Sequence, residues 1–322
     1  MPINDNAAAG TVGVPLRARK SGGATPTLQE QGLPWGIESE YGLLKDVLLG
    51  PAETFRWMMA ENAQYSALCR QSERDGLVFD KQVAMRQHRE MVDAYEQAGV
   101  TVHQHPPMEE LPYQIFARDS SFMTPWGAVI TQLANPRRRG EYASSLRFYL
   151  EAGIPVYDMV SAGCFEGGDF NIIEPGAVLI GYTGLRGEQV AAEQIAAWVE
   201  AEGWEVHFAP IDGFYVHIDL MVCMLAPKLA AVCVDTTPDH VQDWLKSKGI
   251  RFIDVSFRDT MALGCNVVSL GGERVLAPAS SKDLIAKLRA EGFEVYDPDM
   301  GMIMAAGGGV HCMCQALRRE AA

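Results

Sequence analysis

Residues 97–102 (QAGVTV) open a pattern that decides the fold, because the same arrangement returns four more times along the chain. A helix-like segment ends in a small or charged residue followed by glycine, and a short strand follows. The other four stretches are residues 151–156 (EAGIPV), 201–206 (AEGWEV), 247–252 (SKGIRF) and 290–295 (AEGFEV). Each glycine suits the position after a helix end, where a left-handed backbone is needed and glycine adopts it freely. The pattern predicts repeated supersecondary units.

The spacing of these glycines supports a repeat architecture of class α/β. The intervals are 54, 50, 46 and 43 residues, a period typical of repeated units. Each unit is predicted to contain a strand, a second strand, a helix and a final strand after the glycine. Five such units can close into a ring, a pseudo-symmetric α/β propeller without open sheet edges. An ordinary doubly wound α/β sheet is the alternative.

Composition and length predict a soluble globular protein with a single large domain. The chain has 322 residues, of which 48% are hydrophobic and 21% charged, values typical of globular proteins that bury a large core. Residues 1–34 are rich in Ala, Gly, Thr and Pro and are predicted to be a flexible tail, followed by a single domain over residues 35–322. No apolar stretch is long enough to span a bilayer, so no membrane partner is expected.

Charge and cysteine usage narrow the class of partner. The net charge is −14, and the longest basic run is Arg137 to Arg139, which argues against nucleic acid as a partner. An acidic field favours small cationic ligands. The seven cysteines are odd in number and scattered through apolar runs. They predict a reducing compartment, the cytoplasm, and no disulfide framework. A homodimer is the default expectation for the assembly.

Unusual polar residues fall at one place in the repeat. Asp119, Glu166, His217 and Cys312 each lie 13 to 20 residues after the glycine of their unit, and residues 265–266 (Cys-Asn) occupy the same place in the fourth unit. If the units are arranged around an axis, these positions converge on it. The spacing therefore predicts a central site that holds two carboxylates, a histidine and a cysteine.

Each motif has a plainer explanation when it stands alone. Residues 116–119 (FARD) could form a surface ion pair, and residues 166–169 (EGGD) could form a tight turn. In residues 217–219 (HID) two ionisable side chains share one strand face inside an apolar run, which costs free energy unless they are paired or used. In residues 307–312 (GGGVHC) a thiol follows a glycine run, although most cysteines are simply small buried residues.

Taken together and in this order, the four motifs resemble those of the guanidine-modifying superfamily: arginine deiminases, dimethylarginine dimethylaminohydrolases and amidinotransferases. The resemblance covers residues 36 to 320. It implies a five-unit, pentein-like α/β propeller with a central active site, which agrees with the repeat. It also implies a small cationic guanidino substrate and no metal or organic cofactor.

The resemblance implies a role for each site residue. Cys312 resembles the nucleophile, His217 the general acid and base, and Glu166 its carboxylate partner. The residues implied to bind the substrate are Asp119, Asp219, Asp169, Arg186 and Arg118. Arg186 lies where relatives place an arginine for the substrate carboxylate. Residues 181–187 (GYTGLRG) depart from the usual serine-x-arginine-threonine form, so the resemblance does not predict which group the substrate carries at its other end.

Two alternatives to a hydrolase follow from the same residues. An amidinotransferase would pass the amidino group to an amine, and the paired Arg318 and Arg319 are similar to transferase endings. The Glu-Gly-Gly-Asp form of residues 166–169 favours a hydrolase, because transferases tend to carry Asp-Ala-Ala-Asp there. A non-catalytic metal-binding module is the remaining alternative. It would use His217, His311, Cys312 and Cys314, although a lone Cys-x-Cys pair is not a usual zinc pattern.

Overall fold

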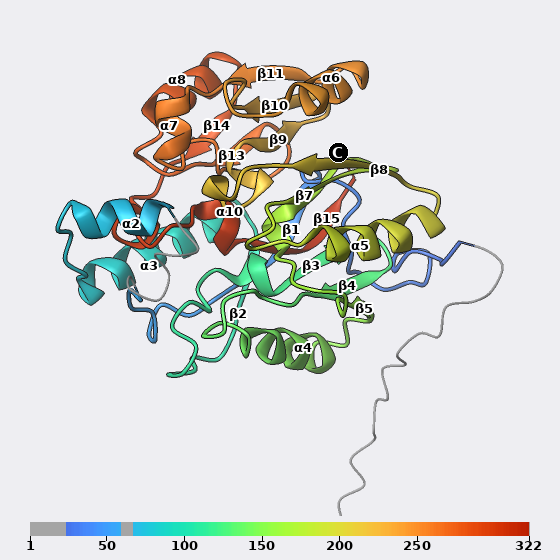
Figure 1. The fold of residues 1–322 in the computed structure, drawn as a ribbon, viewed down its shortest axis with the longest axis horizontal. Helices are drawn as coiled ribbons and strands as arrows, with labels where there is room; N and C mark the ends of the chain where they lie inside the picture. Colours follow the sequence, from blue (N-terminus) through green and yellow to red (C-terminus); the bar gives the residue numbers. More distant parts are fainter. Residues whose placement is uncertain (1–23, 59–66, 322) are drawn as a thin grey trace, which may run out of the picture.

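The computed structural model describes residues 24–58 and 67–321, and within these residues the chain forms a mixed α/β fold of five three-stranded sheets (Figure 1). In every sheet the first strand runs antiparallel to the central strand, and the third runs parallel to it. The sheets are β15 (Gln315–Glu320), β1 (Leu43–Leu49) and β2 (Thr101–Gln104); β3 (Ser121–Thr124), β4 (Gly127–Ile130) and β5 (Val156–Met159); β6 (Phe170–Glu174), β7 (Ala177–Tyr182) and β8 (Glu205–Pro210); β9 (Val222–Ala226), β10 (Leu229–Val232) and β11 (Arg251–Asp254); and β12 (Val268–Ser269), β13 (Arg274–Leu276) and β14 (Glu294–Tyr296).

One long helix precedes the third strand of each sheet, as the repeat predicted. These helices are α3 (Lys81–Gln97), α4 (Glu141–Glu151), α5 (Gln189–Ala201), α6 (Asp239–Ser247) and α8 (Lys282–Ala290). The glycine after each helix has a positive φ, from +66° to +94°. A Cβ added at any of the five would meet no atom within 4 Å. The backbone conformation, and not a lack of space, is therefore what requires glycine at these turns.

Shorter helical segments complete the described chain. They are α2 (Ala67–Arg74), α7 (Phe257–Met261), α9 (Gly301–Met304) and α10 (Val310–Met313), with 3₁₀ turns η1 (Ala117–Ser120), η2 (Gly167–Asp169), η3 (Gly213–Tyr215) and η4 (Ile218–Leu220). Several of them lead directly into the first strand of a sheet, which matters for the site described below.

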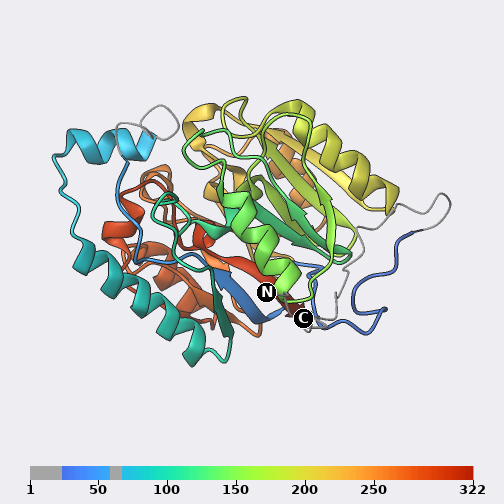
Figure 2. The same ribbon diagram turned by 90° about the horizontal axis from the view of Figure 1, so that it is seen from below.

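The first sheet joins the two ends of the chain. Its central strand β1 runs antiparallel beside β15 (Figure 2). In this pairing Leu48 lies opposite Gln315. Neighbouring sheets also touch: β15 contacts β3, β9 contacts β12, and Leu44 N donates to Leu270 O at 3.0 Å. The cysteine motif, which leads into β15, thus belongs to the first sheet, and the sheet of β12, β13 and β14 lies beside it.

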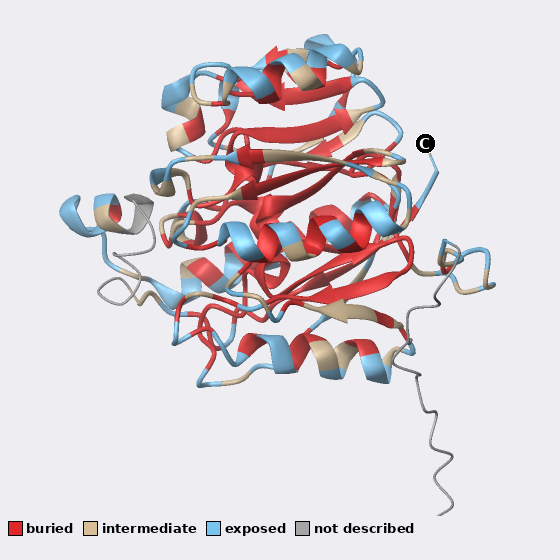
Figure 3. Ribbon diagram, turned by 45° about the vertical axis from the view of Figure 1, so that its right-hand side comes forward, coloured by how far each residue is buried: buried red, intermediate tan, exposed pale blue. Residues whose placement is uncertain are grey.

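The core lies between the sheets and the helices that cover them. Strand residues are mostly buried, while each helix keeps an exposed outer face (Figure 3). Phe122 of β3 stacks on Phe170 of β6 with ring centroids 4.0 Å apart. On α3, Met91 and Tyr95 are fully buried. This burial of apolar side chains is the main force that holds adjacent sheets together.

The amino-terminal segment differs in part from the predicted tail. Residues 1–23 of the predicted tail lie outside the described residues. Further along, Leu28 is fully buried and its N–H donates to Pro125 O at 2.7 Å, and Thr25 bonds the carboxylate of Glu202. The described chain therefore contacts the body earlier than the predicted boundary at residue 35. Among the described helices none is both long and apolar enough to cross a membrane.

Candidate active site

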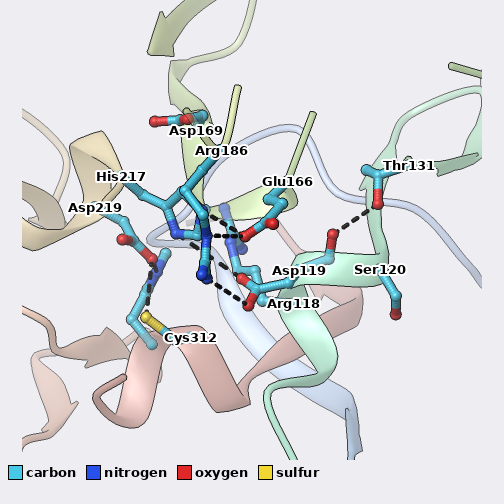
Figure 4. Close-up of polar contacts among 12 residues, drawn as sticks. Arg118, Asp119, Ser120, Thr131, Glu166, Asp169, Arg186, His217, Asp219 and Cys312 are labelled. Carbon is cyan, nitrogen blue, oxygen red and sulfur yellow. Dashed lines mark hydrogen bonds and ion pairs between the residues drawn. The ribbon is translucent and has the colours of Figure 1, made fainter. Parts of the chain in front are cut away.

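Short helical turns at the entrances to four sheets carry nearly all of the predicted site residues. Arg118 and Asp119 lie on η1, Glu166 and Asp169 at η2, His217 and Asp219 at η4, and Cys312 on α10. Equivalent turns from different units thus bring these side chains to one region, as the spacing predicted (Figure 4). Arg186 comes from elsewhere, the loop between β7 and α5.

A cavity opens at this point, and Cys312 lies in its wall. The described residues that line it are Tyr113, Phe116, Asp119, Arg138, Arg186, Val216, His217, Ala306, Gly307, Gly308 and Cys312. Cys312 is only 4% exposed. The predicted nucleophile, the predicted acid–base group and one predicted substrate carboxylate therefore face the same small space.

His217 is held by a buried carboxylate. Its Nε2 lies 2.9 Å from Glu166 Oε2, and Arg186 Nε donates to the same oxygen at 2.8 Å. Burial by itself would raise the pKa of Glu166, but Arg186 and His217 lower it to about 2. Glu166 is thus a carboxylate at neutral pH, able to orient the imidazole.

The environment of His217 favours its cationic form. Burial by itself would lower the pKa of His217, but interactions with Cys312, Glu166 and Asp119 raise it well above its ordinary value. A protonated imidazole beside a cavity can give a proton to a leaving group, and it can later take one from water.

Cys312 has a carboxylate as its close neighbour. Its Sγ lies 3.7 Å from Asp219 Oδ2, which also accepts a 2.8 Å hydrogen bond from His311 Nδ1. Asn266 Oδ1 accepts from the backbone N–H groups of His311 and Cys312 at 2.9 and 3.3 Å. Burial, followed by the charge of Asp219, raises the pKa of the Cys312 thiol to about 12. The unliganded site therefore holds a thiol, and not the reactive thiolate.

Alkylation of Cys312 by iodoacetamide is expected to be slow at pH 7 and to speed up about tenfold per pH unit up to pH 10, because only the thiolate reacts. Asp219→Asn removes the largest charge contribution while keeping an oxygen acceptor for His311. The variant should therefore lower the pKa of the thiol and react faster than wild type at pH 8. Peptide mass spectrometry localises the label, and an unchanged or slower rate in Asp219→Asn would contradict this account.

Arg138 is a central part of the site that the sequence did not single out. It is 1% exposed. It donates to both oxygens of Glu141, at 2.8 and 2.7 Å, and to Asp119 Oδ2 at 2.7 Å. In the sequence it stood only as one member of the basic run 137–139, whose neighbouring residue Arg137 is exposed. Its partners are set by long-range packing, which charge counting does not predict.

Arg138→Met is expected to lower the free energy of unfolding by about 3–5 kcal/mol, because it leaves Glu141 and Asp119 as buried carboxylates without their cation. Arg137→Met is the matched control at an exposed site and should change stability by less than about 0.5 kcal/mol. Urea unfolding followed by circular dichroism measures both. Equal, small changes in the two variants would show that Arg138 has little structural role.

Three residues predicted to bind substrate, Arg118, Asp169 and Asp219, are not among the described residues that line the cavity. Asp219 still lies 3.7 Å from Cys312 Sγ, whereas Arg118 and Asp169 make other contacts. Arg118 donates to Glu40 Oε1 at 2.9 Å and to Phe170 O at 2.8 Å. Asp169 Oδ1 accepts from the N–H of Ile218 at 2.9 Å, and burial raises the pKa of Asp169 to about 7. We therefore place both in the support of the site, where Asp169 anchors the turn that carries His217.

Two further supporting groups escaped the sequence analysis. Glu40 pairs with Arg118, and its Oε2 lies 3.8 Å from His311 Nε2. His311 was visible in the cysteine motif, but its contact with Asp219 was not predicted. The spacing did point to Asn266, which supports the backbone of Cys312 and also donates to Asp219 O at 3.1 Å.

Two groups of side chains bring potential metal ligands within 4.8 Å of one another. One is His217, Asp219 and Cys312, and the other is Asp119, Glu166 and His217. In the described part of the chain Cys314 belongs to neither group. The predicted ligand set, with Cys312 and Cys314 together, is therefore not one of the two that the described residues assemble.

Comparison with known proteins identifies relatives of this chain. A family model described as N,N dimethylarginine dimethylhydrolase, eukaryotic, matches residues 54–319. The uncharacterized protein YkgA of Bacillus subtilis is 25% identical over 284 residues, which cover 87% of this chain and 94% of YkgA.

Solved structures with the same fold include a hydrolase and a transferase. Dimethylarginine dimethylaminohydrolase from Pseudomonas aeruginosa, solved with citrulline, has a TM-score of 0.69 and 20% identity and covers 85% of this chain and 99% of its own. SxtG, an amidinotransferase from Microseira wollei, has a TM-score of 0.70 and 17% identity, with 90% and 98% covered. At these identities the likeness concerns the fold.

Proposed function

The chain belongs to the N,N-dimethylarginine dimethylhydrolase family, and on this premise we propose that it is a cysteine-dependent hydrolase of a small guanidino compound. The observation that carries the proposal is the cavity lined by Cys312, His217 and Asp119, with the buried carboxylates of Glu166 and Asp219 next to His217 and Cys312. Among the described residues, Asp119 Oδ1, Glu166 Oε1 and Asp219 Oδ1 are buried without a hydrogen-bond partner. A ligand that is cationic and rich in N–H donors would provide the hydrogen bonds that these three oxygens lack.

A guanidinium group meets this requirement. It is planar and cationic, and its N–H groups point outward in a fixed fork that matches carboxylate oxygens. Carboxylates on two sides of the group would hold its carbon near Cys312 Sγ. The positive charge would also lower the pKa of the thiol, which burial and Asp219 hold high in the empty site. Substrate binding would thus help the Cys312 thiol to release its proton to solvent and become the thiolate that attacks the guanidinium carbon.

In the first half-reaction one C–S bond forms and one C–N bond breaks. The Cys312 thiolate adds to the guanidinium carbon and gives a tetrahedral adduct. His217 then donates a proton to the departing nitrogen, the C–N bond breaks, and ammonia or an amine leaves. A thiouronium attached to Cys312 remains. Glu166, 2.9 Å from His217 Nε2, would hold the imidazole in place throughout.

The second half reaction restores the enzyme. His217, now neutral, takes a proton from water as the oxygen attacks the same carbon. The C–S bond breaks, the Cys312 thiolate departs, and the remaining hydroxyl proton of the adduct passes to solvent as the ureido product is released. Water and the guanidino compound supply every atom, so the scheme needs no oxidant or other co-reactant.

We also propose that the five units close into a propeller around this site. Contacts between consecutive units support closure: Ile218 N bonds Asp169 Oδ1 at 2.9 Å, and Ser269 Oγ bonds Leu225 O at 2.7 Å. The hydrogen bond from Leu44 N to Leu270 O links the last unit to the first. Closure would explain why side chains from separate units meet at one cavity.

Two observations favour hydrolysis over amidino transfer. A Cβ at Gly168 would lie 2.5 Å from His217 Nδ1, and one at Gly167 would lie 2.1 Å from Arg118 O, so the Asp-Ala-Ala-Asp form would not fit here without a shift. The paired arginines lie outside the cavity lining. Arg319 donates to the backbone of Gly42 and Ser269, and Arg318 donates to Asp46.

The deciding experiment incubates the purified protein with a panel of guanidino compounds and measures ureido product and released amine. The panel holds arginine, its methylated forms, agmatine and short guanidino acids, each with and without glycine as an acceptor. Ureido product with stoichiometric amine supports the hydrolase. Amidino transfer to glycine would move the chain to the transferases, and a stoichiometric metal content without turnover would favour the metal-binding alternative.

A further inference from the structure

The two arginines that line the cavity are already held by buried carboxylates. Arg138 spans Glu141 and Asp119 through three hydrogen bonds of 2.7 to 2.8 Å. Arg186 donates from Nε to Glu166 at 2.8 Å, and its Nη2 lies 3.9 Å from Asp119 Oδ2. Each positive charge in the lining is therefore balanced before any substrate arrives.

Arg186 is directed toward the acceptors of the site (Figure 4). The loop that carries it is closed by a hydrogen bond from Gly184 N to Gly187 O at 2.8 Å, and Thr183 Oγ1 accepts from Arg186 N at 3.0 Å. Arg186 Nε is already bonded to Glu166, which is fully buried, so only the Nη groups could meet a carboxylate on a substrate. Nη2 lies 3.9 Å from Asp119 Oδ2, so a carboxylate that reached it would lie close to a like charge, which is unfavourable.

The remaining walls offer apolar surface. Tyr113, Phe116, Val216 and Ala306 line the cavity beside the charged groups. A substrate carboxylate placed against Phe116, Val216 and Ala306 would lose water without gaining a partner from these side chains, which is costly. An alkyl chain in the same place would gain from burial.

We propose that the substrate of this site is a guanidino compound whose other end carries no carboxylate: an alkylguanidine, or one that ends in an amine. The proposal deepens the hydrolase function above and rests on it. The unpaired oxygens of Asp119, Glu166 and Asp219 attract cations, and the net charge of −14 adds to that field. This field would repel an anionic tail, and both arginines that could bind such a tail are already paired. The site would therefore exclude carboxylates as well as attract cations.

Matched substrate pairs test this selection. Arginine is compared with agmatine, which is arginine without its carboxylate, and 4-guanidinobutyrate is compared with butylguanidine. In each pair the compound without a carboxylate is expected to have a kcat/KM at least about tenfold higher, measured as ureido product. Equal or better turnover of the carboxylate-bearing member in both pairs would overturn the proposal.

Arg186→Gln separates the role inferred for Arg186 from direct binding of a carboxylate. The variant is expected to lose activity on every compound, because Glu166 loses its cation. A general loss cancels in the ratio within a pair, so the agmatine-to-arginine ratio of kcat/KM should stay within about threefold of wild type. If Arg186 instead bound the substrate carboxylate, kcat/KM would fall further for arginine than for agmatine, and the ratio would rise more than about tenfold.

A binding measurement keeps this inference distinct from the proposed function. Butylguanidine and 4-guanidinobutyrate are titrated as protectants of wild-type Cys312 against iodoacetamide, with labelling read by mass spectrometry. Protection at a lower concentration of butylguanidine supports the ligand class even if no compound is turned over, in which case only the hydrolase function fails. Stronger protection by the acid, or protection by neither compound, would overturn the inference.

Discussion

Cys312→Ser is expected to abolish turnover, by at least about 10³-fold in kcat, because a serine hydroxyl is a far weaker nucleophile at neutral pH than a thiolate. The fold should remain intact. The substitution changes one atom at a side chain 4% exposed, and the backbone of residue 312 keeps its hydrogen bond to Asn266. Ureido product measured under saturating substrate gives the activity, and thermal unfolding checks the fold.

Cys314→Ser is the matched control for this experiment. It makes the same chemical change two residues away, at a thiol that is also buried but is not among the described residues that line the cavity. We expect it to keep activity within about tenfold of wild type. An active Cys312→Ser beside an inactive Cys314→Ser would show that the nucleophile is assigned to the wrong cysteine.

His217→Ala is expected to reduce turnover by about 10²–10⁴-fold, the usual contribution of a positioned acid–base group. The loss should affect both half-reactions, because the same imidazole protonates the leaving nitrogen and later deprotonates water. His240→Ala, at an exposed histidine on α6, is the matched control and should leave activity unchanged. Wild-type turnover by His217→Ala would remove His217 from the mechanism.

A variant that removes only a charge extends the prediction for His217. Glu166→Gln keeps the shape of the side chain but removes the charge that helps to hold His217 protonated. The pKa of His217 should therefore fall. Because the first half-reaction needs the protonated imidazole, the alkaline limb of the kcat/KM profile should move to lower pH. A profile that keeps its position while activity drops would show that Glu166 acts on structure alone.

Much of the fold was predictable because its information is local. A helix that ends at a glycine with positive φ gives a recognisable sequence pattern within six residues. Five such patterns predict the repeat without any knowledge of which strands pair. The same regularity placed Asp119, Glu166, His217 and Cys312 at equivalent points, and the structure brings them to one region. Asn266 was found by spacing as well.

The pairing of side chains from distant segments was not predictable in this way. Arg138 reads as part of a basic run until its burial against Glu141 and Asp119 is known. Glu40 lies 78 residues from Arg118, and no short motif connects them. Arg118 and Asp169 sit inside motifs that pointed to the substrate, yet their hydrogen bonds place them behind the cavity.

Local sequence therefore specified the units of this protein and the residue types at their entrances, since turn geometry and spacing depend on near neighbours. Tertiary structure decided which oxygen each arginine meets, which carboxylates keep an unpaired oxygen, and which side of the site Arg186 faces. These outcomes depend on the balance between desolvation and pairing of charges brought together across the whole chain. That balance exists only once the sheets have packed.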